Sequence, residues 1–320
     1  MIVAGLDEAG YGPRLGPLVV ACTAFSVDRP PAQVSPDLWE LLGRAVCREP
    51  SKDGRVWVAD SKQVKPKKDG VRLLELAVLS FLASGGPLPA SLPELLGAVG
   101  TDPVWAGAAA PWYGGLAAQR LPSLCWAGEV HTRAARLREV GQAAGVRFLG
   151  AGARVVPEAH FNARVRETDN KAAVLSEACV ELLRALRAAW PGPLDVLVDK
   201  HGGRDHYARL LGSAFPLCPI DPIEEGGELS AYRIRSPQGP VRVIFRQEAE
   251  LHGLPVALGS MLAKYLREMF MAQLNAWFQA RLPGLKPTAG YALDANRFLE
   301  EVGEALPRLG VDREALVRAR

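Results

Sequence analysis

The sequence lacks a hydrophobic run long enough to cross a bilayer. The best candidate, LLELAVLSFLA at residues 73–83, contains Glu75 and is shorter than the roughly 18 apolar residues that a membrane-spanning helix needs. The first residues hold neither a basic leader nor an apolar segment of signal-peptide length. These absences predict a soluble, cytoplasmic protein that does not enter a membrane.

Cysteine and histidine are also scarce, with five residues of each. An odd number of cysteines without a CxxC pair fits neither a disulfide framework nor a zinc ribbon, so we expect them to be small buried side chains. The nearest histidine pair, His201 and His206, lacks the i, i+4 spacing that places two ligands on one helix face. Soft-metal chemistry is therefore not expected. The cysteines are Cys22, Cys47, Cys125, Cys179 and Cys218.

Neither sign of charge dominates the chain. It has 38 basic and 35 acidic residues, a net charge of +3, so the overall charge does not identify a partner. Local clustering is more informative, because residues 61–68, SKQVKPKK, gather four lysines and no acid. Such a run suits a nucleic-acid backbone, although a solvated loop has the same composition.

What the sequence does contain is typical of a globular α/β protein. Its 320 residues, 48% of them hydrophobic and 23% charged, are enough for one large domain or two modest ones. Short apolar runs separated by Gly and Pro predict strands, and longer amphipathic runs predict helices. The expected strands cover residues 2–6, 17–27, 146–156, 194–199 and a two-stranded ribbon at 231–245. The expected helices cover residues 37–48, 69–84 with Asp69 as N-cap, 129–145, 169–189, 254–281 and 292–307.

We interpret residues 1–320 as a single domain with two distinctive parts. Residues 85–128 are rich in Gly, Pro, Ala and Trp, which predicts an inserted lid or subdomain. Residues 254–310 form a C-terminal helical part. Within the insertion, Trp105, Trp112 and Tyr113 could stack on a nucleic-acid base, but closing a small satellite core is the favoured interpretation.

Acidic residues follow two of the predicted strands. Asp7 and Glu8 end the first, and Asp199 ends the apolar run LDVLVD. If these strands are neighbours, three carboxylates meet at one edge of the sheet, and hard cations such as Mg²⁺ or Mn²⁺ would neutralise them. Two such ions about 4 Å apart can activate water and stabilise a leaving oxygen in phosphodiester hydrolysis. Glu248 and Glu250 are both candidates for a fourth acid.

Four motifs in this order resemble the type 2 ribonucleases H, the family of ribonuclease HII and ribonuclease HIII. DEAGYGPRLGPLVVA (7–21) resembles the family opening DEAGRGPLAGPVVVA, and DSKQV (60–64) resembles DSKKL. LVDKH (197–201) is similar to the strand of the third acid, and SMLAKY (260–265) to the SILAKV helix. The resemblance implies a ribonuclease H-like mixed sheet flanked by helices. It also implies metal-dependent hydrolysis of RNA in RNA:DNA hybrids, or of ribonucleotides embedded in duplex DNA, to give 5′-phosphate and 3′-OH ends.

The resemblance further implies a catalytic and metal-binding set with Mg²⁺ or Mn²⁺ in a two-metal mechanism. Glu250 takes the fourth position, where ribonuclease HIII has glutamate and ribonuclease HII aspartate, and PEAHFN with Asn170 is also similar to ribonuclease HIII. Tyr11 stands where ribonuclease HII has arginine, which leaves open whether single ribonucleotides or long hybrids are preferred. The implied catalytic residues are Asp7, Glu8, Asp199 and Glu250. The implied substrate-binding residues are Gly10, Tyr11, Gly12, Lys62, Lys264 and Tyr291.

Two other functions fit the same sequence. One is a structure-selective DNA nuclease on the same fold, because fold analogy does not fix the substrate. The other is a non-catalytic hybrid-binding paralogue, although a binder has no reason to gather four repelling carboxylates. We expect the protein to be a monomer that acts in DNA replication and repair.

Overall fold

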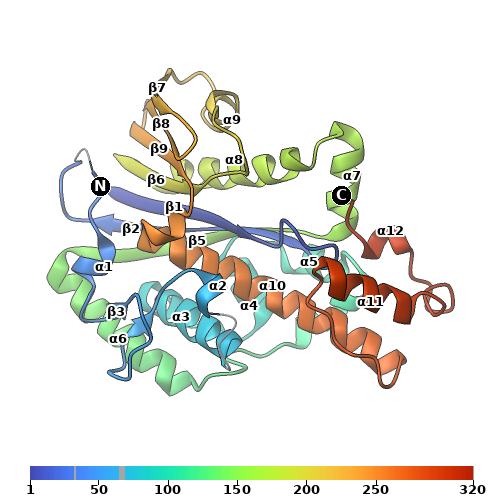
Figure 1. The fold of residues 1–320 in the computed structure, drawn as a ribbon. Coiled ribbons are helices and arrows are strands. Elements are labelled where there is room, and N and C mark those ends of the chain that lie inside the picture. Colours follow the sequence, from blue (N-terminus) through green and yellow to red (C-terminus); the bar gives the residue numbers. More distant parts are fainter. Residues whose placement is uncertain (32–33, 65–68, 320) are drawn as a thin grey trace.

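A mixed seven-stranded sheet organises the computed structural model, which describes residues 1–31, 34–64 and 69–319. In the described residues the strand order is β5-β2-β1-β6-β9-β8-β7 (Figure 1). Neighbours are antiparallel except that β6 runs parallel to both β1 and β9. The strands of this sheet are β1 (Ile2–Ala9), β2 (Leu18–Val27), β5 (Val146–Val156), β6 (Leu194–Asp199), β7 (Ile220–Glu225), β8 (Leu229–Ser236) and β9 (Gly239–Arg246).

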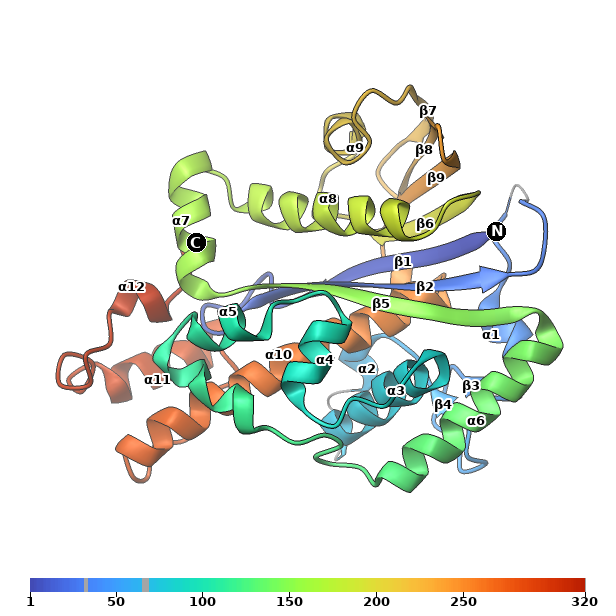
Figure 2. The ribbon, with the colours of Figure 1, turned by 180° about the vertical axis from the view of Figure 1, so that it is seen from behind.

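Helices cover both faces of the sheet (Figure 1), and Figure 2 shows the same arrangement from behind, with α8 on one face and α10, α3 and α6 on the other. This confirms the expected α/β class with a mixed sheet flanked by helices. The short strands β3 (Val46–Cys47) and β4 (Val56–Trp57) form a separate parallel pair. The helices are α1 (Leu38–Leu41), α2 (Ser61–Val64), α3 (Gly70–Gly85), α4 (Leu92–Ala98), α5 (Pro103–Ala108), α6 (Ala127–Ala144), α7 (Glu158–Thr168), α8 (Lys171–Ala189), α9 (Ala208–Ala214), α10 (Leu254–Arg281), α11 (Ala292–Val302) and α12 (Arg313–Leu316).

Strand β2 shows why one sheet carries two cores. Its side chains alternate between the faces, as the pleat of a strand requires. Val19 and Phe25 join the core beneath α10 and α3, whereas Val20 and Cys22 join the core beneath α8. Because both faces are covered, the strand is a continuous apolar run rather than an alternating one.

Several predicted boundaries were wrong. The helix expected at residues 37–48 is only α1, because the chain enters β3 at Val46. Asp69 precedes α3 but its side chain makes no capping hydrogen bond. Asn170 is the capping residue of α8, and it accepts a hydrogen bond from the amide of Ala172 at 2.9 Å. The last long helix, α11, ends at Val302 rather than near residue 307.

Residues 85–128 form α4, α5 and the 3-10 helix Pro111–Ala118. Trp112 and Tyr113 are fully buried in the larger core, where Tyr113 contacts Phe270 of α10, whereas Trp105 is 42% exposed. The expected satellite core for these aromatic residues was therefore wrong, since two of them belong to the main core. A lid function for this segment stays a prediction.

Lys65, Lys67 and Lys68 of the lysine run lie outside the described residues. Among the described residues, no helix combines the length and the apolar character needed to cross a membrane.

Two glycines let α10 lie directly against the sheet. A Cβ atom on Gly5 of β1 would lie 2.2 Å from the backbone nitrogen of Val256, and one on Gly259 would lie 3.3 Å from the carbonyl oxygen of Ala21. The hydroxyl of Thr23 donates to the carbonyl oxygen of Pro255 at 2.8 Å and fixes the same contact. This close packing sets the position of α10 relative to the end of β1.

We predict that Gly5→Ala destabilises the protein by about 1–3 kcal/mol, because the added methyl group overlaps backbone atoms that have no room to move. The free energy of unfolding from urea denaturation measures the effect. Gly97→Ala is the matched control, since a Cβ atom at this position in α4 meets nothing within 4 Å and alanine is the better helix former. Equal stability of wild type and Gly5→Ala would contradict the tight contact.

Candidate metal centre

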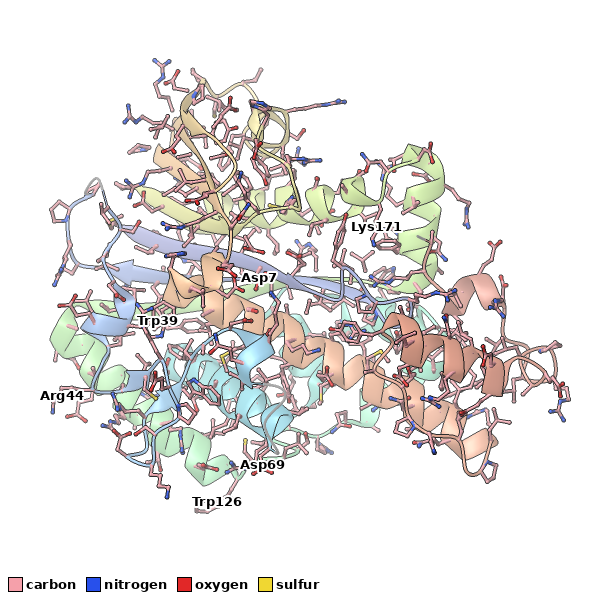
Figure 3. All side chains as sticks on the ribbon, in the orientation of Figure 1. Asp7, Trp39, Arg44, Asp69, Trp126 and Lys171 are labelled. Carbon is pink, nitrogen blue, oxygen red and sulfur yellow. The ribbon has the colours of Figure 1, made fainter. Side chains whose placement is uncertain are left out.

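Three acidic side chains meet where β1 stops pairing with β6: Asp7 and Glu8 lie within β1, which continues to Ala9, and Asp199 ends β6. The two strands are parallel neighbours with Leu6 opposite Val198, so the acids that follow lie side by side. One carboxylate oxygen each from Asp7, Glu8 and Asp199 lies within 4.8 Å of the others, and Figure 3 labels Asp7 at this edge, near the start of α10. The structure thus brings together the three acids that the sequence placed at strand ends.

Glu250 adds a fourth carboxylate to this cluster. It lies on the 3-10 helix Ala249–Leu251 just before α10 and is only 4% exposed. Its negative charge helps to raise the pKa of Asp7, Glu8 and Asp199, so it lies near enough to act on all three. Glu248, which the sequence alone could not separate from it, is exposed and has a left-handed backbone with φ of 51°. The tertiary structure therefore places Glu250, not Glu248, at the cluster.

Helix α10 and the chain before it hold these acids in place. Ser260 of α10 lies beside Asp7 and lowers the pKa of its carboxyl against the effect of burial, and the Ser260 hydroxyl lies 2.9 Å from that of Ser61 in α2. The amide of Ala249 donates to Asp199 at 3.2 Å. Ser61 and Ser260 were not predicted as site residues, although both lie in the quoted DSKQV and SMLAKY motifs. Only the packing of α2 against α10 reveals their role.

The cluster is electrostatically unfavourable without a cation. Burial, then the charges of Glu8 and Asp199, raises the pKa of Asp7 well above its ordinary value. Burial, then Asp199, raises the pKa of Glu8 to about 7, and burial raises that of Asp199 to about 6. Burial opposes the ammonium form of Lys62, but the attraction of Glu250 and other acids prevails and raises its pKa.

The donor set fits a hard divalent cation. It consists of carboxylate oxygens, the ligands that Mg²⁺ and Mn²⁺ prefer. Glu250 Oε2 is buried and has no hydrogen-bond partner among the described residues, which is costly unless something else satisfies it. Lys62 is the one cation within ion-pair distance of Glu250 in the described chain, with its Nζ 3.5 Å from Oε1 and its side chain 80% exposed. The cluster is therefore compatible with divalent metal binding.

The loop after β1 passes beside the acids. Gly10 has a φ of 89°, and a Cβ atom there would lie 2.6 Å from both Arg267 Nε and the carbonyl oxygen of Pro17. Gly12 is exposed, with open space around its Cα. Tyr11 between them is half-buried against the core beneath α8, and burial followed by the charge of Glu8 raises its pKa. The backbone at Gly12 is thus accessible, whereas Gly10 is required by packing.

The remaining predicted substrate-binding residues lie on the helical side of this loop. Tyr291 is the N-cap residue of α11 and is 49% exposed. Its ring lies 5.8 Å from Lys264 Nζ and 5.6 Å from the guanidinium carbon of Arg267. Lys264 also pairs with Glu268 at 2.8 Å, one turn along α10. A structural ion pair therefore accounts for Lys264, and a phosphate contact at this residue stays a prediction.

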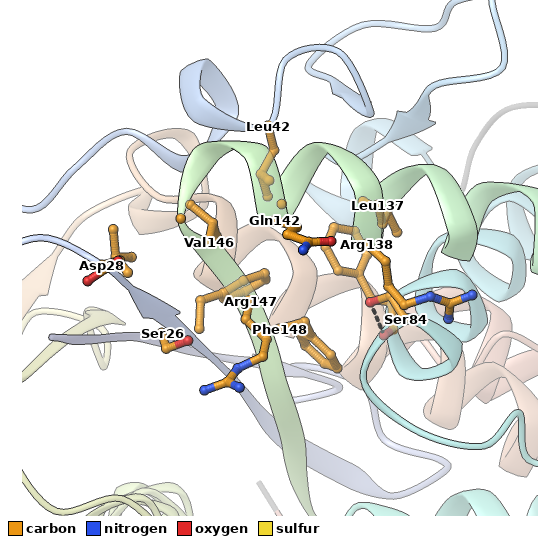
Figure 4. Close-up of a pocket in the computed structure, with 15 residues that line it drawn as sticks. Ser26, Asp28, Leu42, Ser84, Leu137, Arg138, Gln142, Val146, Arg147 and Phe148 are labelled. Atoms are coloured by element: carbon orange, nitrogen blue, oxygen red, sulfur yellow. Dashed lines mark hydrogen bonds between the residues drawn. The ribbon is translucent and has the colours of Figure 1, made fainter.

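A separate apolar pocket of about 600 Å³ lies between α6, the end of β2 and the start of β5 (Figure 4). Phe25, Phe81 and Phe148 line it and contact one another edge to face, with ring centroids 5.2–5.8 Å apart. Its lining, which comprises described residues only, includes none of the predicted site residues. This pocket is therefore distinct from the acidic cluster.

Comparison with solved structures identifies the fold. The chain is similar to ribonuclease H2 from Pyrococcus horikoshii OT3, with a TM-score of 0.52 and 15% identity over 99% of this chain and 92% of that one. It also matches RNase HII in a PCNA complex from Archaeoglobus fulgidus (TM-score 0.44, 17% identity, 100% and 95% coverage) and Bst-RNase HIII in complex with Mn²⁺ (0.44, 18%, 99% and 66%). No protein-family model and no curated protein sequence matches the chain. The first likeness shows a type 2 ribonuclease H-like fold.

We predict that metal-free protein loses stability as the pH rises from about 4 to 7. The pKa values of Asp7, Glu8 and Asp199 are higher in the folded than in the unfolded chain, so the folded state holds more protons in this window and deprotonation favours unfolding. Asp7→Asn should raise the melting temperature at pH 8 by about 2–4 °C for each kcal/mol of relieved repulsion. The gain should shrink at pH 4.

Thermal unfolding in the presence of a chelator measures this effect, and added Mn²⁺ provides the second comparison. Mn²⁺ should stabilise the wild type more than Asp7→Asn, because the variant has lost one ligand and one negative charge. Asp221→Asn, on the exposed edge strand β7, is the control for loss of a carboxylate elsewhere. A wild-type melting temperature that is independent of both pH and Mn²⁺ would contradict the coupled acidic cluster.

Proposed function

We propose that this protein is a metal-dependent endoribonuclease that hydrolyses RNA in RNA:DNA hybrids or ribonucleotides embedded in duplex DNA. The observation that carries the proposal is the meeting of Asp7, Glu8 and Asp199 at one edge of the sheet, with Glu250 near enough for its charge to act on all three, in a type 2 ribonuclease H-like fold. Stability does not explain this cluster, since two buried and two half-buried carboxylates repel one another. A divalent cation and a phosphodiester substrate would explain it.

The proposed reaction leaves 5′-phosphate and 3′-OH ends. Mg²⁺ or Mn²⁺, held by the four acids as a pair of ions, would supply an activated water and stabilise the departing 3′-oxygen. The protein's own residues hold the acids: Ser260 orients Asp7, and the amide of Ala249 orients Asp199. Raised pKa values mean that the empty cluster retains protons near neutral pH, so metal binding should release them.

The surrounding residues are suited to hold a nucleic acid. The exposed backbone at Gly12 can approach a ribose 2′-OH, the group that distinguishes RNA from DNA. Lys62 presents an exposed ammonium group next to Glu250, where it can contact a phosphate of the cleaved strand. The half-exposed ring of Tyr291 can stack on a sugar or base. We assign these three residues, with Gly10 and Tyr11, to substrate binding.

Two labelled duplexes test the function: one with a single ribonucleotide in DNA, and one long RNA:DNA hybrid, each incubated with Mg²⁺, Mn²⁺ or chelator. We expect metal-dependent cutting of at least one of them. Cutting of the first would indicate recognition of a single ribonucleotide, and cutting of only the second would indicate recognition of an RNA tract. Equal cutting of an all-DNA junction would support a DNA nuclease, and binding without turnover would support a non-catalytic hybrid-binding protein.

We predict that Glu250→Gln lowers the cleavage rate about 100-fold or more. Replacing a residue that only hydrogen-bonds a metal ligand usually costs about 10–100-fold, and we expect a larger loss for a ligand itself. Glu248→Gln is the matched control, because it makes the same change two residues away on an exposed side chain. Asp7→Asn should abolish cleavage while the fold is retained. Single-turnover assays measure both rates, and full activity of Asp7→Asn would refute the proposed mechanism.

A further inference from the structure

Lys171 lies beside the loop that follows the acidic strand β1. It is the first residue of α8, and its ammonium nitrogen lies 4.6 Å from the centroid of the Tyr11 ring. Figure 3 labels Lys171 in the gap between α8 and this loop. The capping hydrogen bond of Asn170 fixes the backbone of the first turn of α8, and with it the attachment point of the lysine side chain.

No acidic side chain neutralises Lys171 within residues 1–31, 34–64 and 69–319. Lys171 makes no ion pair with any of these residues. Burial, and then the nearby charge of Arg318, lowers the pKa of Lys171, and no carboxylate raises it. A lysine retained only for stability usually extends into solvent or pairs with an acid. Lys171 instead places its charge on the face of an aromatic ring, an arrangement that holds an ammonium group in one direction.

Two arginines extend the positive charge around the same loop. Arg204, in the loop after β6, acts on Tyr11 and donates to the hydroxyl of Ser176 at 3.0 Å. Arg318 is 3% exposed, packs 4.8 Å from the centroid of the Phe161 ring and donates to the carbonyl oxygen of Pro13. Its Nε and Nη1 atoms are buried and have no partner in the described part of the chain.

The acids that face this region do not cancel its charge. Glu8 is the carboxylate that acts on Tyr11, and it belongs to the acidic cluster, where a cation would occupy it. Glu158 acts on Arg318 from α7, but it already accepts hydrogen bonds from the Tyr113 hydroxyl and the Gly16 amide. The α8 side of the loop therefore presents uncompensated positive charge next to a cluster of negative charge.

We propose that Lys171, held over Tyr11, binds a backbone phosphate of the nucleic-acid duplex on the α8 side of the acidic cluster. This inference rests on the proposed function and adds a phosphate site to it. A phosphodiester supplies the missing negative charge. A lysine ammonium group contacts phosphate as a point charge, and this contact does not depend on the base sequence of the nucleic acid. Tyr11 orients the lysine in this arrangement, while Arg204 and Arg318 provide the surrounding positive potential.

The test is the salt dependence of binding to a labelled RNA:DNA hybrid in the presence of chelator, which prevents cleavage. Loss of one phosphate contact should reduce the slope of log Kd against log salt by about 0.7–0.9. We expect this reduction, and a weaker Kd at low salt, for Lys171→Ala and for Lys171→Gln. Lys171→Arg should retain the wild-type slope, because the positive charge is preserved, whereas Tyr11→Leu, which removes the ring beneath the ammonium group, should weaken binding.

Lys52→Ala is the matched control, since Lys52 is an exposed lysine on the loop between β3 and β4. Thermal unfolding verifies that each variant is folded, and Lys171→Gln replaces Lys171→Ala if the alanine variant is not. An unchanged slope and Kd in a folded Lys171 variant would overturn the inference while leaving the proposed function intact. Failure of the wild type both to bind the hybrid and to cleave it with Mn²⁺ would overturn the two together.

Discussion

Repulsion between buried and half-buried carboxylates is the constraint on which the organisation of this protein depends. The parallel pairing of β1 with β6 forces Asp7, Glu8 and Asp199 into one small volume, and the turn before α10 adds Glu250. Such a cluster persists only when the surrounding fold is stable enough to hold it. Covered faces on both sides of the sheet and a long buried helix provide that stability here.

Helix α10 links the core to the cluster. Its first turns lie on β1 because Gly5 and Gly259 leave no side chain between helix and strand, and this contact brings Ser260 to Asp7. Further along, Arg267 is completely buried and donates to the carbonyl oxygens of Leu15 and Ala289, each at 3.1 Å. The same helix thus fixes the acids, the loop after β1 and the turn that carries Tyr291.

Opposite charges are separated across the loop after β1. The acids lie in the last residues of β1, at the end of β6 and in the turn before α10. The cations Lys171, Arg204 and Arg318 approach the loop from α8, the loop after β6 and the C-terminal segment. These cations are far apart in the sequence, and no sequence motif marked any of them as a site residue. A nucleic acid would bind the acids through metal ions and would contact the cations directly. The proposed substrate therefore explains both the acidic cluster and the positive charge beside it.

The sequence by itself determined the strands β1, β2 and β6, the acids at their ends and the mixed α/β class, because apolar run length and polar strand exits are local properties. The choice of Glu250 over Glu248 followed from the family resemblance, and the three-dimensional packing gave the physical reason, since burial and direction in a turn depend on distant neighbours. Only the tertiary structure placed Trp112 and Tyr113 in the main core, Ser61 against Ser260, and Lys171 over Tyr11. Each of these contacts joins segments tens to hundreds of residues apart, where local patterns carry no information and packing alone decides.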